Sequence, residues 1–214
     1  MRKKILVVTS SRADYGILKP LILKIRKKVN LKIVVTGSHI SNYYGNTYKE
    51  IEKDKIKIDY KIKNIVTKNN EIGISNTIAI TIKKFTKVIK GENPDIIVIL
   101  GDRFEIFTCA VSALICEIPI AHIHGGELTE GSIDNSFRHS ITKMSHLHFV
   151  SHMSAKKRIV QMGENPKSVF NVGSLSVEQI QKEKFYKKNE LEKYLGFKLQ
   201  KKNIFITLHP NTIE

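Results

Sequence analysis

Four short segments of this sequence are rich in titratable side chains, and three of them also contain glycines, as acid–base chemistry or anion binding requires. They are residues 9–16, 100–105, 121–127 and 134–143. Arginines in three of them would neutralise an anion, while the carboxylates and imidazoles would exchange protons near neutral pH. Together these residue types describe an anion-binding enzyme cleft, although they do not by themselves name a reaction.

The first segment places Arg12 at the expected start of a helix, a position suited to an anionic ligand. The alternative is that Arg12 pairs with Asp14 and simply caps the turn. The segment contains neither a G-x-G-x-x-G pattern nor a P-loop, so it predicts no dinucleotide or Walker-type phosphate cradle.

In the second segment, Asp102 and Arg103 follow Gly101 at the end of a buried apolar run. Asp102 is then a proton acceptor, a contact to a ribose or a metal, or the N-cap of the next helix. Taken alone, this spacing favours the N-cap.

The third segment holds His122 and His124, which would face the same side of an extended strand. With Glu127 they suggest zinc, but two histidines and one carboxylate make an incomplete local ligand set, so no metal is expected. Gly125 and Gly126 are better explained by a close approach of the backbone to a ligand.

The fourth segment places Asp134 and Arg138 on one face of a helix. Asp134 is either held by Arg138 as an i,i+4 ion pair or stands at the helix start as an acid or base. The two cysteines, Cys109 and Cys116, lie one heptad apart on an apolar helix and are expected to be core thiols.

The elements that must position these segments alternate along the chain. Short runs rich in Ile and Val predict strands at residues 4–9, 31–36, 95–100, 119–122, 147–150 and 169–172. Helical patterns occupy residues 17–28, 74–90, 104–116, 134–144 and 155–162, and residues 174–196 indicate one or two more helices. This alternation predicts a Rossmann-like α/β fold, a parallel sheet with helices on both faces and its chemistry at the carboxyl edge.

Composition narrows the classes of partner. The 214 residues carry 36 Lys and Arg against 20 Asp and Glu, a formal net charge of +16. That excess suggests nucleic acid, yet residues 101–150 hold three basic and six acidic side chains, and no alternation of aromatic and basic residues appears. A solvated lysine-rich surface is favoured over a nucleic-acid site.

The chain offers no candidate membrane or secretion signal. Its longest apolar run, residues 96–100, is far below the ~20 residues of a membrane span, and residues 1–14 lack a secretory apolar core. Two cysteines make no disulfide framework, so a reducing cytoplasm is expected, with no membrane partner.

In this order, several motifs resemble the hydrolysing UDP-N-acetylglucosamine 2-epimerases of sialic-acid biosynthesis and their relatives that act on bacillosamine-type sugars. The matching stretches are residues 11–16, 36–39, 44–47, 100–105, 122–127, 133–134, 138–143 and 209–210. The resemblance implies the N-terminal domain of a GT-B-like two-domain fold, with the chain covering about half of a family member.

The resemblance also implies a domain organisation. Residues 1–173 would form the catalytic Rossmann-like domain, residues 174–202 a helical linker, and residues 203–214 the first strand of a C-terminal UDP-binding domain. The full-length protein would be a homodimer that needs no cofactor. The chain alone would be inactive, because much of the nucleotide site belongs to the other domain.

The implied reaction converts UDP-N-acetylglucosamine and water into N-acetylmannosamine and UDP, by elimination of UDP and hydration of the resulting glycal. The alternative keeps this chemistry and changes the substrate to UDP-2,4-diacetamido-2,4,6-trideoxyglucose, for legionaminic acid. By resemblance the catalytic residues are Asp102, Asp134 and His124, and the substrate-binding residues are Arg12, Arg103, His209, Gly125, Gly126 and Glu127.

Overall fold

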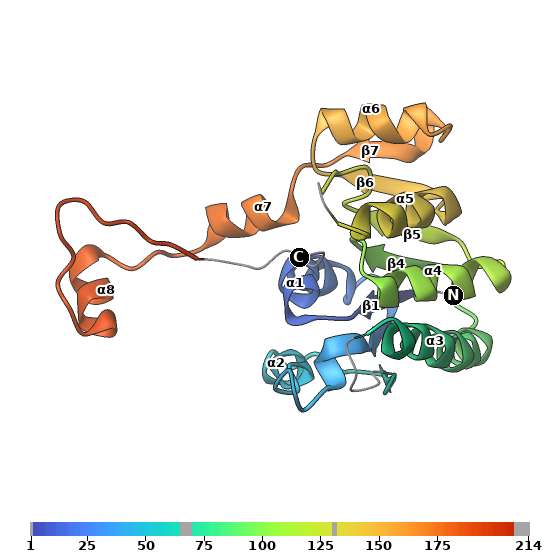
Figure 1. The fold of residues 1–214 in the computed structure, drawn as a ribbon, viewed down its shortest axis with the longest axis horizontal. Coiled ribbons are helices and arrows are strands. Elements are labelled where there is room, and N and C mark those ends of the chain that lie inside the picture. Colours follow the sequence, from blue (N-terminus) through green and yellow to red (C-terminus); the bar gives the residue numbers. More distant parts are fainter. Residues whose placement is uncertain (1, 65–69, 130–131, 208–214) are drawn as a thin grey trace.

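The computed structural model describes residues 2–64, 70–129 and 132–207, and in them one seven-stranded sheet has the order β3-β2-β1-β4-β5-β6-β7 (Figure 1). The strands are β1 (Lys4–Thr9), β2 (Asn30–Val35), β3 (Tyr60–Lys61), β4 (Ile96–Leu100), β5 (Ile120–Ile123), β6 (Leu147–Val150) and β7 (Val169–Asn171). Every neighbouring pair is parallel. The predicted parallel sheet is therefore confirmed.

Six of the seven strands lie where the apolar runs predict them, and β3 is missing from the prediction. It is only two residues long and pairs with the end of β2. A strand this short carries no periodic pattern, so nothing in its local sequence marks it.

Helices α1 to α6 lie between successive strands, and α7 and α8 follow the last strand. They are α1 (Arg12–Ile25), α2 (Tyr48–Lys53), α3 (Glu71–Glu92), α4 (Phe104–Ile115), α5 (Asp134–Met144), α6 (Met153–Gln161), α7 (Leu175–Lys182) and α8 (Lys188–Leu195), with short 3-10 turns at Gly37–Ile40 and Pro166–Ser168. Helix α2 was not predicted, because its six residues are too few for a clear helical period.

Helix α1 begins five residues before the predicted start at Ile17. Ser11 is its N-cap, with extended backbone and a side chain that accepts from the backbone N–H of Asp14. Asp14 in turn accepts from the backbone N–H of Ser10, so two free donors of the helix start are satisfied. This capping brings Arg12 and Asp14 into the helix itself, directly after β1.

Two apolar cores lie on the two faces of the sheet and confirm that helices cover both. One unites alternate residues of β1 and β4 with α3, α4 and α5, including Leu6, Ile97, Phe85, Ile106 and Ile141. The other unites the opposite residues of the same strands with α1 and α2. Cys109 is buried in the first core and Cys116 packs against it, as expected.

The chain leaves the sheet after β7. Helix α7 packs against α1, and Lys24 of α1 forms a 2.9 Å ion pair with Glu178 of α7. Helix α8 stands apart from the sheet (Figure 1). The strand expected from residue 203 is not formed in the described residues 203–207, where Ile204, Phe205 and Ile206 are exposed. The physical reason is that a strand is not stable without a neighbour to pair with.

No helix among the described residues is long and apolar enough to cross a membrane.

Candidate functional site

The candidate site lies where the order of the strands reverses. Strands β1 and β4 are neighbours, and the chain runs outward from them toward β3 on one side and β7 on the other. At such a point the loops after the two strands diverge and leave a crevice at the carboxyl edge of the sheet. The loops after β1, β4 and β5 deliver Arg12, Asp102 and His124 to this edge.

Asp102 forms an ion pair with Arg138, a partner that the sequence did not predict for it. Arg138 lies in α5, is 6% exposed, and one of its terminal nitrogens donates to the Asp102 carboxylate. The same nitrogen donates to Thr129 Oγ1 at 3.0 Å, and the other donates to Asn135 Oδ1 at 3.3 Å. Asp102 is not the N-cap of α4. Arg103 occupies that position, and its side chain makes no capping hydrogen bond.

The surroundings of Asp102 favour its protonated form. Burial is the largest cause and raises the pKa of the carboxyl group, and the nearby charges of Asp134 and Asp14 raise it further, against the opposing effect of Arg138. A carboxyl group that gains and loses a proton more readily near neutral pH suits general acid–base chemistry.

Asp134 begins α5, close enough for its charge to act on Asp102. It is half-buried and accepts a 2.7 Å hydrogen bond from the hydroxyl of Ser132. The predicted alternative of an i,i+4 pair with Arg138 is wrong, because Arg138 turns to Asp102 instead. The structure thus brings together the two carboxylates that the sequence singled out.

His124 lies one residue beyond the end of β5 and has a left-handed backbone, with φ 61°. The extended backbone of the strand ends before it, although the charge of His124 still acts on His122. Burial lowers the pKa of His124, with Glu127 opposing and Arg138 adding to the shift. Its buried Nε2 has no hydrogen-bond partner among the described residues, which leaves a neutral imidazole nitrogen free for a ligand.

His122 instead ties the sheet to the helices. It is fully buried, its Nε2 donates to the carbonyl of Gly101 at 2.8 Å, and its Nδ1 accepts from the hydroxyl of Thr142 at 3.3 Å. Burial lowers the pKa of His122 to about 3, so this imidazole is neutral and holds β4, β5 and α5 in register. No group of three His, Cys, Asp or Glu within the described part of the chain is arranged to hold a metal ion.

Gly125 and Gly126 make close approaches to the protein itself. A Cβ on Gly125 would come within 2.8 Å of the His122 ring, and one on Gly126 within 2.6 Å of the Ala155 carbonyl of α6. Gly126 also has φ 75°, a conformation that glycine adopts without strain. Packing of α6 and His122 thus accounts for both glycines, and their contact with a substrate stays a prediction. Glu127 accepts a 2.5 Å hydrogen bond from Ser151.

The two predicted arginines differ in their surroundings. Arg12 is mostly exposed and forms a 3.1 Å ion pair with Glu50, so the predicted alternative of a pair with Asp14 is not found. Arg103 forms a 3.2 Å ion pair with Glu105, which is 1% exposed and has one carboxylate oxygen without a partner among the described residues. Burial is the largest single influence on Arg103 and opposes its charge, but Glu105, Asp14 and Asp134 together outweigh burial and raise the pKa of the guanidinium.

His209, the remaining predicted contact, lies outside the described residues. The residue that sequence reasoning missed is Arg138. Its spacing to Asp134 offered a nearby partner of the right charge, whereas its actual partner lies 36 residues away along the chain. No local pattern predicts a pair of that kind, and only the adjacency of β4 and β5 brings α5 beside the end of β4.

Comparison with known proteins shows the family to which this chain belongs. Residues 22–214 match the model of the family described as UDP-N-acetylglucosamine 2-epimerase. The chain is 44% identical, over 99% of its length and 56% of the relative's, to the hydrolysing GDP/UDP-N,N'-diacetylbacillosamine 2-epimerase of Campylobacter jejuni. It is 40% identical, over 99% of its length and 54% of the relative's, to the polysialic acid biosynthesis protein P7 of Escherichia coli.

Among solved structures, the fold is similar to that of MnaA from S. aureus in complex with UDP. The two share a TM-score of 0.75 at 22% identity, over 90% of this chain and 51% of that one. The chain therefore spans about half the length of the curated relatives it matches.

Proposed function

The chain belongs to the UDP-N-acetylglucosamine 2-epimerase family, and from this premise we propose that its sheet-edge residues form one side of the cleft of a hydrolysing UDP-sugar 2-epimerase. Its sheet with helices on both faces is the N-terminal half of a GT-B-like fold. One observation carries the proposal: Arg138 binds the Asp102 carboxylate, the charge of Asp134 acts on Asp102 and that of Arg138 on His124, and the buried Nε2 of His124 has no hydrogen-bond partner among the described residues.

The reaction explains why these groups are needed. Elimination of UDP breaks the bond from C1 to the diphosphate oxygen and removes the unactivated proton on C2, which requires a positioned base. Water then adds at C1 of the glycal while an acid returns a proton to C2 from the other face. Two acid–base groups are therefore needed, one for each face, and we assign these roles to Asp102 and Asp134, with His124 as the third group.

The leaving diphosphate needs positive charge as its negative charge builds. Arg12 and Arg103 stand at the starts of α1 and α4 beside the crevice, and we propose that they and His209 contact UDP. Gly125, Gly126 and Glu127 would border the sugar. The ion pairs of Arg12 with Glu50 and of Arg103 with Glu105 then exchange or share partners when the diphosphate binds.

The sugar has two candidates. UDP-N-acetylglucosamine would give N-acetylmannosamine for sialic acid, and the 40% identity to the E. coli polysialic acid protein supports it. The trideoxy sugar with acetamido groups at C2 and C4 would give the legionaminic-acid precursor, and the 44% identity to the C. jejuni enzyme favours it. Both candidates use the same groups of this chain, since both react at C1 and C2.

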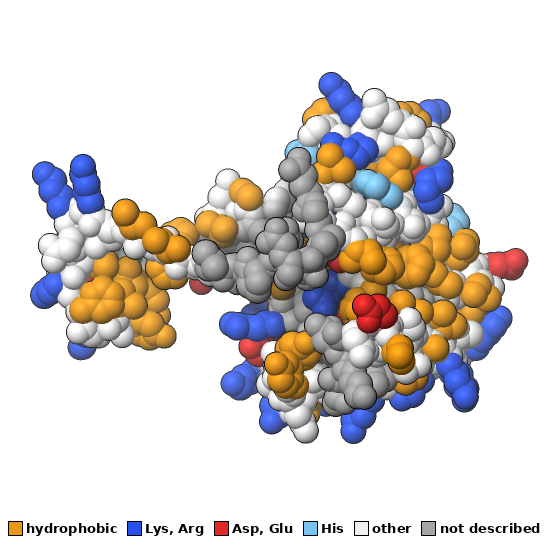
Figure 2. Space-filling view, viewed as in Figure 1, with side chains coloured by type: hydrophobic (Ala, Val, Ile, Leu, Met, Phe, Trp, Pro, Cys, Tyr) orange, Lys and Arg blue, Asp and Glu red, His pale blue; other side chains and the backbone are white. Residues whose placement is uncertain are grey.

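The remaining half of the cleft would come from a second domain. We propose that residues 1–173 form the catalytic domain, residues 174–202 a linker, and residues 203–214 the first strand of that second domain. Apolar side chains gather around α8 (Figure 2), where Tyr186 and Tyr194 stack and Phe185 and Phe197 are exposed. Such a face is normally covered by further protein, and without it the chain would not turn over its substrate.

We further propose that the whole protein is a cytoplasmic homodimer without nucleic-acid or membrane partners. Light scattering tests the dimer. A gel shift at two salt concentrations tests the excess of lysine, because binding to phosphates would weaken steeply as salt is raised.

The decisive experiment joins this chain to its downstream coding sequence and measures UDP release from both UDP-sugars. We expect release with formation of the 2-epimerised free sugar from one or both, and none from the chain alone. UDP release with retention of configuration at C2, or no release from either substrate by the soluble joined protein, would overturn the proposal.

A further inference from the structure

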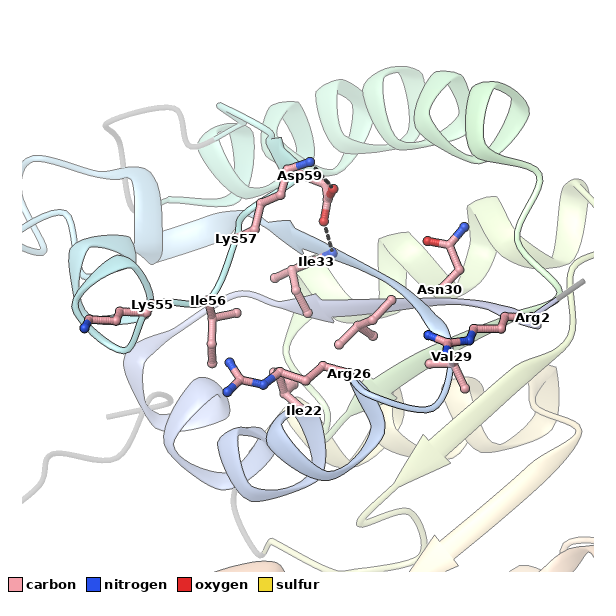
Figure 3. Close-up of a pocket in the computed structure, with 11 residues that line it drawn as sticks. Arg2, Ile22, Arg26, Val29, Asn30, Ile33, Lys55, Ile56, Lys57 and Asp59 are labelled. Carbon is pink, nitrogen blue, oxygen red and sulfur yellow. Dashed lines mark hydrogen bonds and ion pairs between the residues drawn. The ribbon is translucent and has the colours of Figure 1, made fainter.

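A second hollow lies at the opposite, amino edge of the sheet, far from the candidate site. It has a volume of about 530 Å³ and is bordered by the end of α1, the start of β2 and the loop that follows α2 (Figure 3). This volume falls within the ~300–1,000 Å³ of typical small-molecule pockets.

The floor of this amino-edge pocket is apolar. Ile22 of α1, Ile33 of β2 and Ile56 of the loop line it, and each is at most 6% exposed. All three belong to the core between α1 and the sheet, so the floor is fixed by packing rather than by mobile side chains.

The rim of the pocket is cationic. Arg2, Arg26 and Lys55 line it, and none of them forms an ion pair with a carboxylate in the described part of the chain. In Figure 3 the guanidinium group of Arg26 lies beside Ile56 and that of Arg2 beside Val29, toward opposite ends of the pocket, whereas Lys55 points outward. Two unpaired guanidinium groups beside an apolar floor attract an anion with an apolar body.

The only carboxylate that lines the pocket is already used by the protein. Asp59 accepts a 3.0 Å hydrogen bond from the backbone N–H of Ile33, and Lys32 and Lys57 lie 3.3 and 3.5 Å from it. Its negative charge is therefore balanced before Arg2 and Arg26 are counted.

The end of α1 adds little negative charge to the pocket. The carbonyl of Ile22 accepts from the backbone N–H of Arg26, and the carbonyl of Ile25 accepts from those of Lys28 and Val29. Because backbone N–H groups of the chain satisfy these last-turn carbonyls, the negative end of the helix dipole repels an anion at the rim less strongly.

We propose that the amino-edge pocket binds a small organic anion, a phosphate or carboxylate attached to an aromatic or aliphatic group. The anion contacts the guanidinium group of Arg26, Arg2 adds positive charge from the other end of the pocket, and the apolar group rests on Ile22, Ile33 and Ile56. A bidentate guanidinium contact suits phosphate and carboxylate alike. The apolar floor stabilises the complex by ~25 cal/mol for each Å² of apolar ligand surface that it removes from water. The pocket is separate from the UDP-sugar cleft, because the six residues of β1 span about 20 Å between the two edges.

The test is a titration of the ¹⁵N-labelled chain with phenyl phosphate, followed through backbone amide shifts. We expect saturable shifts at residues 29–33 and 55–57 and unchanged amides at residues 101–102 and 124–127. Benzoate in place of phenyl phosphate shows which anion the pocket prefers, and either preference supports the proposal. Inorganic phosphate and phenol, which each offer half of the recognised chemistry, are expected to bind at least tenfold more weakly.

Variants connect the binding to the named side chains. The double variant Arg2→Ala/Arg26→Ala should raise the Kd for phenyl phosphate at least tenfold. The control Lys27→Ala/Lys28→Ala removes the same total charge, next to Arg26 at the exposed end of α1 and without touching the pocket, and its Kd should stay within twofold of the wild type. Arg26→Glu reverses one exposed charge and should abolish saturable binding, which keeps the test valid if the double variant folds poorly.

Three results would overturn the proposal. Equal weakening in the lysine control would show attraction to general surface charge. Binding of inorganic phosphate as tight as that of phenyl phosphate would mean an adventitious ion only. Wild-type binding by Arg26→Glu and by the folded double variant would place the ligand elsewhere.

Discussion

Two aspartates stand at the two ends of the same strand and have opposite acid–base behaviour. Asp95 directly precedes β4, and Asp102 follows it by two residues. The backbone N–H of Lys4 and the side chain of Lys3 donate to Asp95, at 2.7 and 3.1 Å, and lower the pKa of its carboxyl group. Burial raises the pKa of Asp102 although Arg138 is bound to it.

The comparison shows that surroundings give the same residue type two different roles. At the amino edge the carboxylate is exposed and fully paired, so it holds β1 beside β4 and needs no proton. At the carboxyl edge Asp102 is partly buried near the carboxylates of Asp134 and Asp14. Burial and these charges raise the free energy of its charged form, which favours proton exchange. The predictions below test this contrast between the two ends of β4.

The largest expected effect is on turnover. In the chain joined to its downstream half, Asp102→Asn should lower kcat for UDP release by about 10³-fold, because general acid–base groups contribute ~10²–10⁴-fold. The matched variant Asp95→Asn should leave kcat within twofold. A joined Asp102→Asn protein that retains a tenth or more of the wild-type rate would remove Asp102 from the proposed mechanism.

The second prediction concerns stability. Arg138→Leu should lower the free energy of unfolding by about 3 kcal/mol, because it leaves Asp102 partly buried without its cation. Lys3→Met, which breaks the exposed pair at the other end of β4, should cost less than about 0.5 kcal/mol. Urea denaturation of the chain measures both. Similar losses in the two variants would show that burial does not separate the two pairs.

The third prediction concerns the glycines that follow β4 and β5. Gly101 and Gly126 have nearly the same backbone conformation, with φ 77° and 75°. A Cβ on Gly101 meets no atom within 4 Å, whereas one on Gly126 meets the Ala155 carbonyl at 2.6 Å. Gly101→Ala should therefore cost only the backbone strain, about 1 kcal/mol, and Gly126→Ala clearly more. Equal unfolding midpoints in urea would contradict the packing role given to Gly126.

The smallest effect is a pair of opposite pH dependences. Because the pKa of Asp95 is lowered in the folded chain, its contribution to stability is present above its ordinary pKa and is lost as pH falls through the folded value. Asp102 has a raised pKa, so its contribution to stability is fully present below its ordinary pKa and is lost as pH rises through the raised folded value. Carbon-13 titration of the two carboxyl groups should place Asp102 above Asp95. The reverse order would invalidate the contrast.

Local sequence predicted the elements well and their ends less well. Helix α1 starts at Arg12 rather than Ile17, because Ser11 caps it and Asp14 closes the cap. The apolar period visible in the sequence began only after Gly16, and a capping interaction precedes the residues that show a period. Ser-x-x-Asp at residues 11–14 is the signal from which the earlier start was predictable.

Spacing and family resemblance singled out Asp102, Asp134 and His124, and the structure brings them to one edge of the sheet, while their catalytic roles stay a prediction. Their contacts within the protein were not predictable. Gly125 and Gly126 were expected to approach a ligand, and the structure shows that they also make room for His122 and α6. Whether a glycine makes room for a ligand or for a helix depends on what the fold places opposite it.

Apolar periodicity and strand–helix alternation are local properties, so the sequence alone predicted the order of the strands and helices except α2 and β3, and hence the parallel sheet. The pairing of Arg138 with Asp102 across 36 residues, rather than with Asp134 four residues away, is set by tertiary packing. The partner of Arg138 depends on which strand end the start of α5 lies beside. Burial of that contact then shifts the pKa of Asp102. Both are properties of the assembled sheet edge, and no short stretch of sequence contains them.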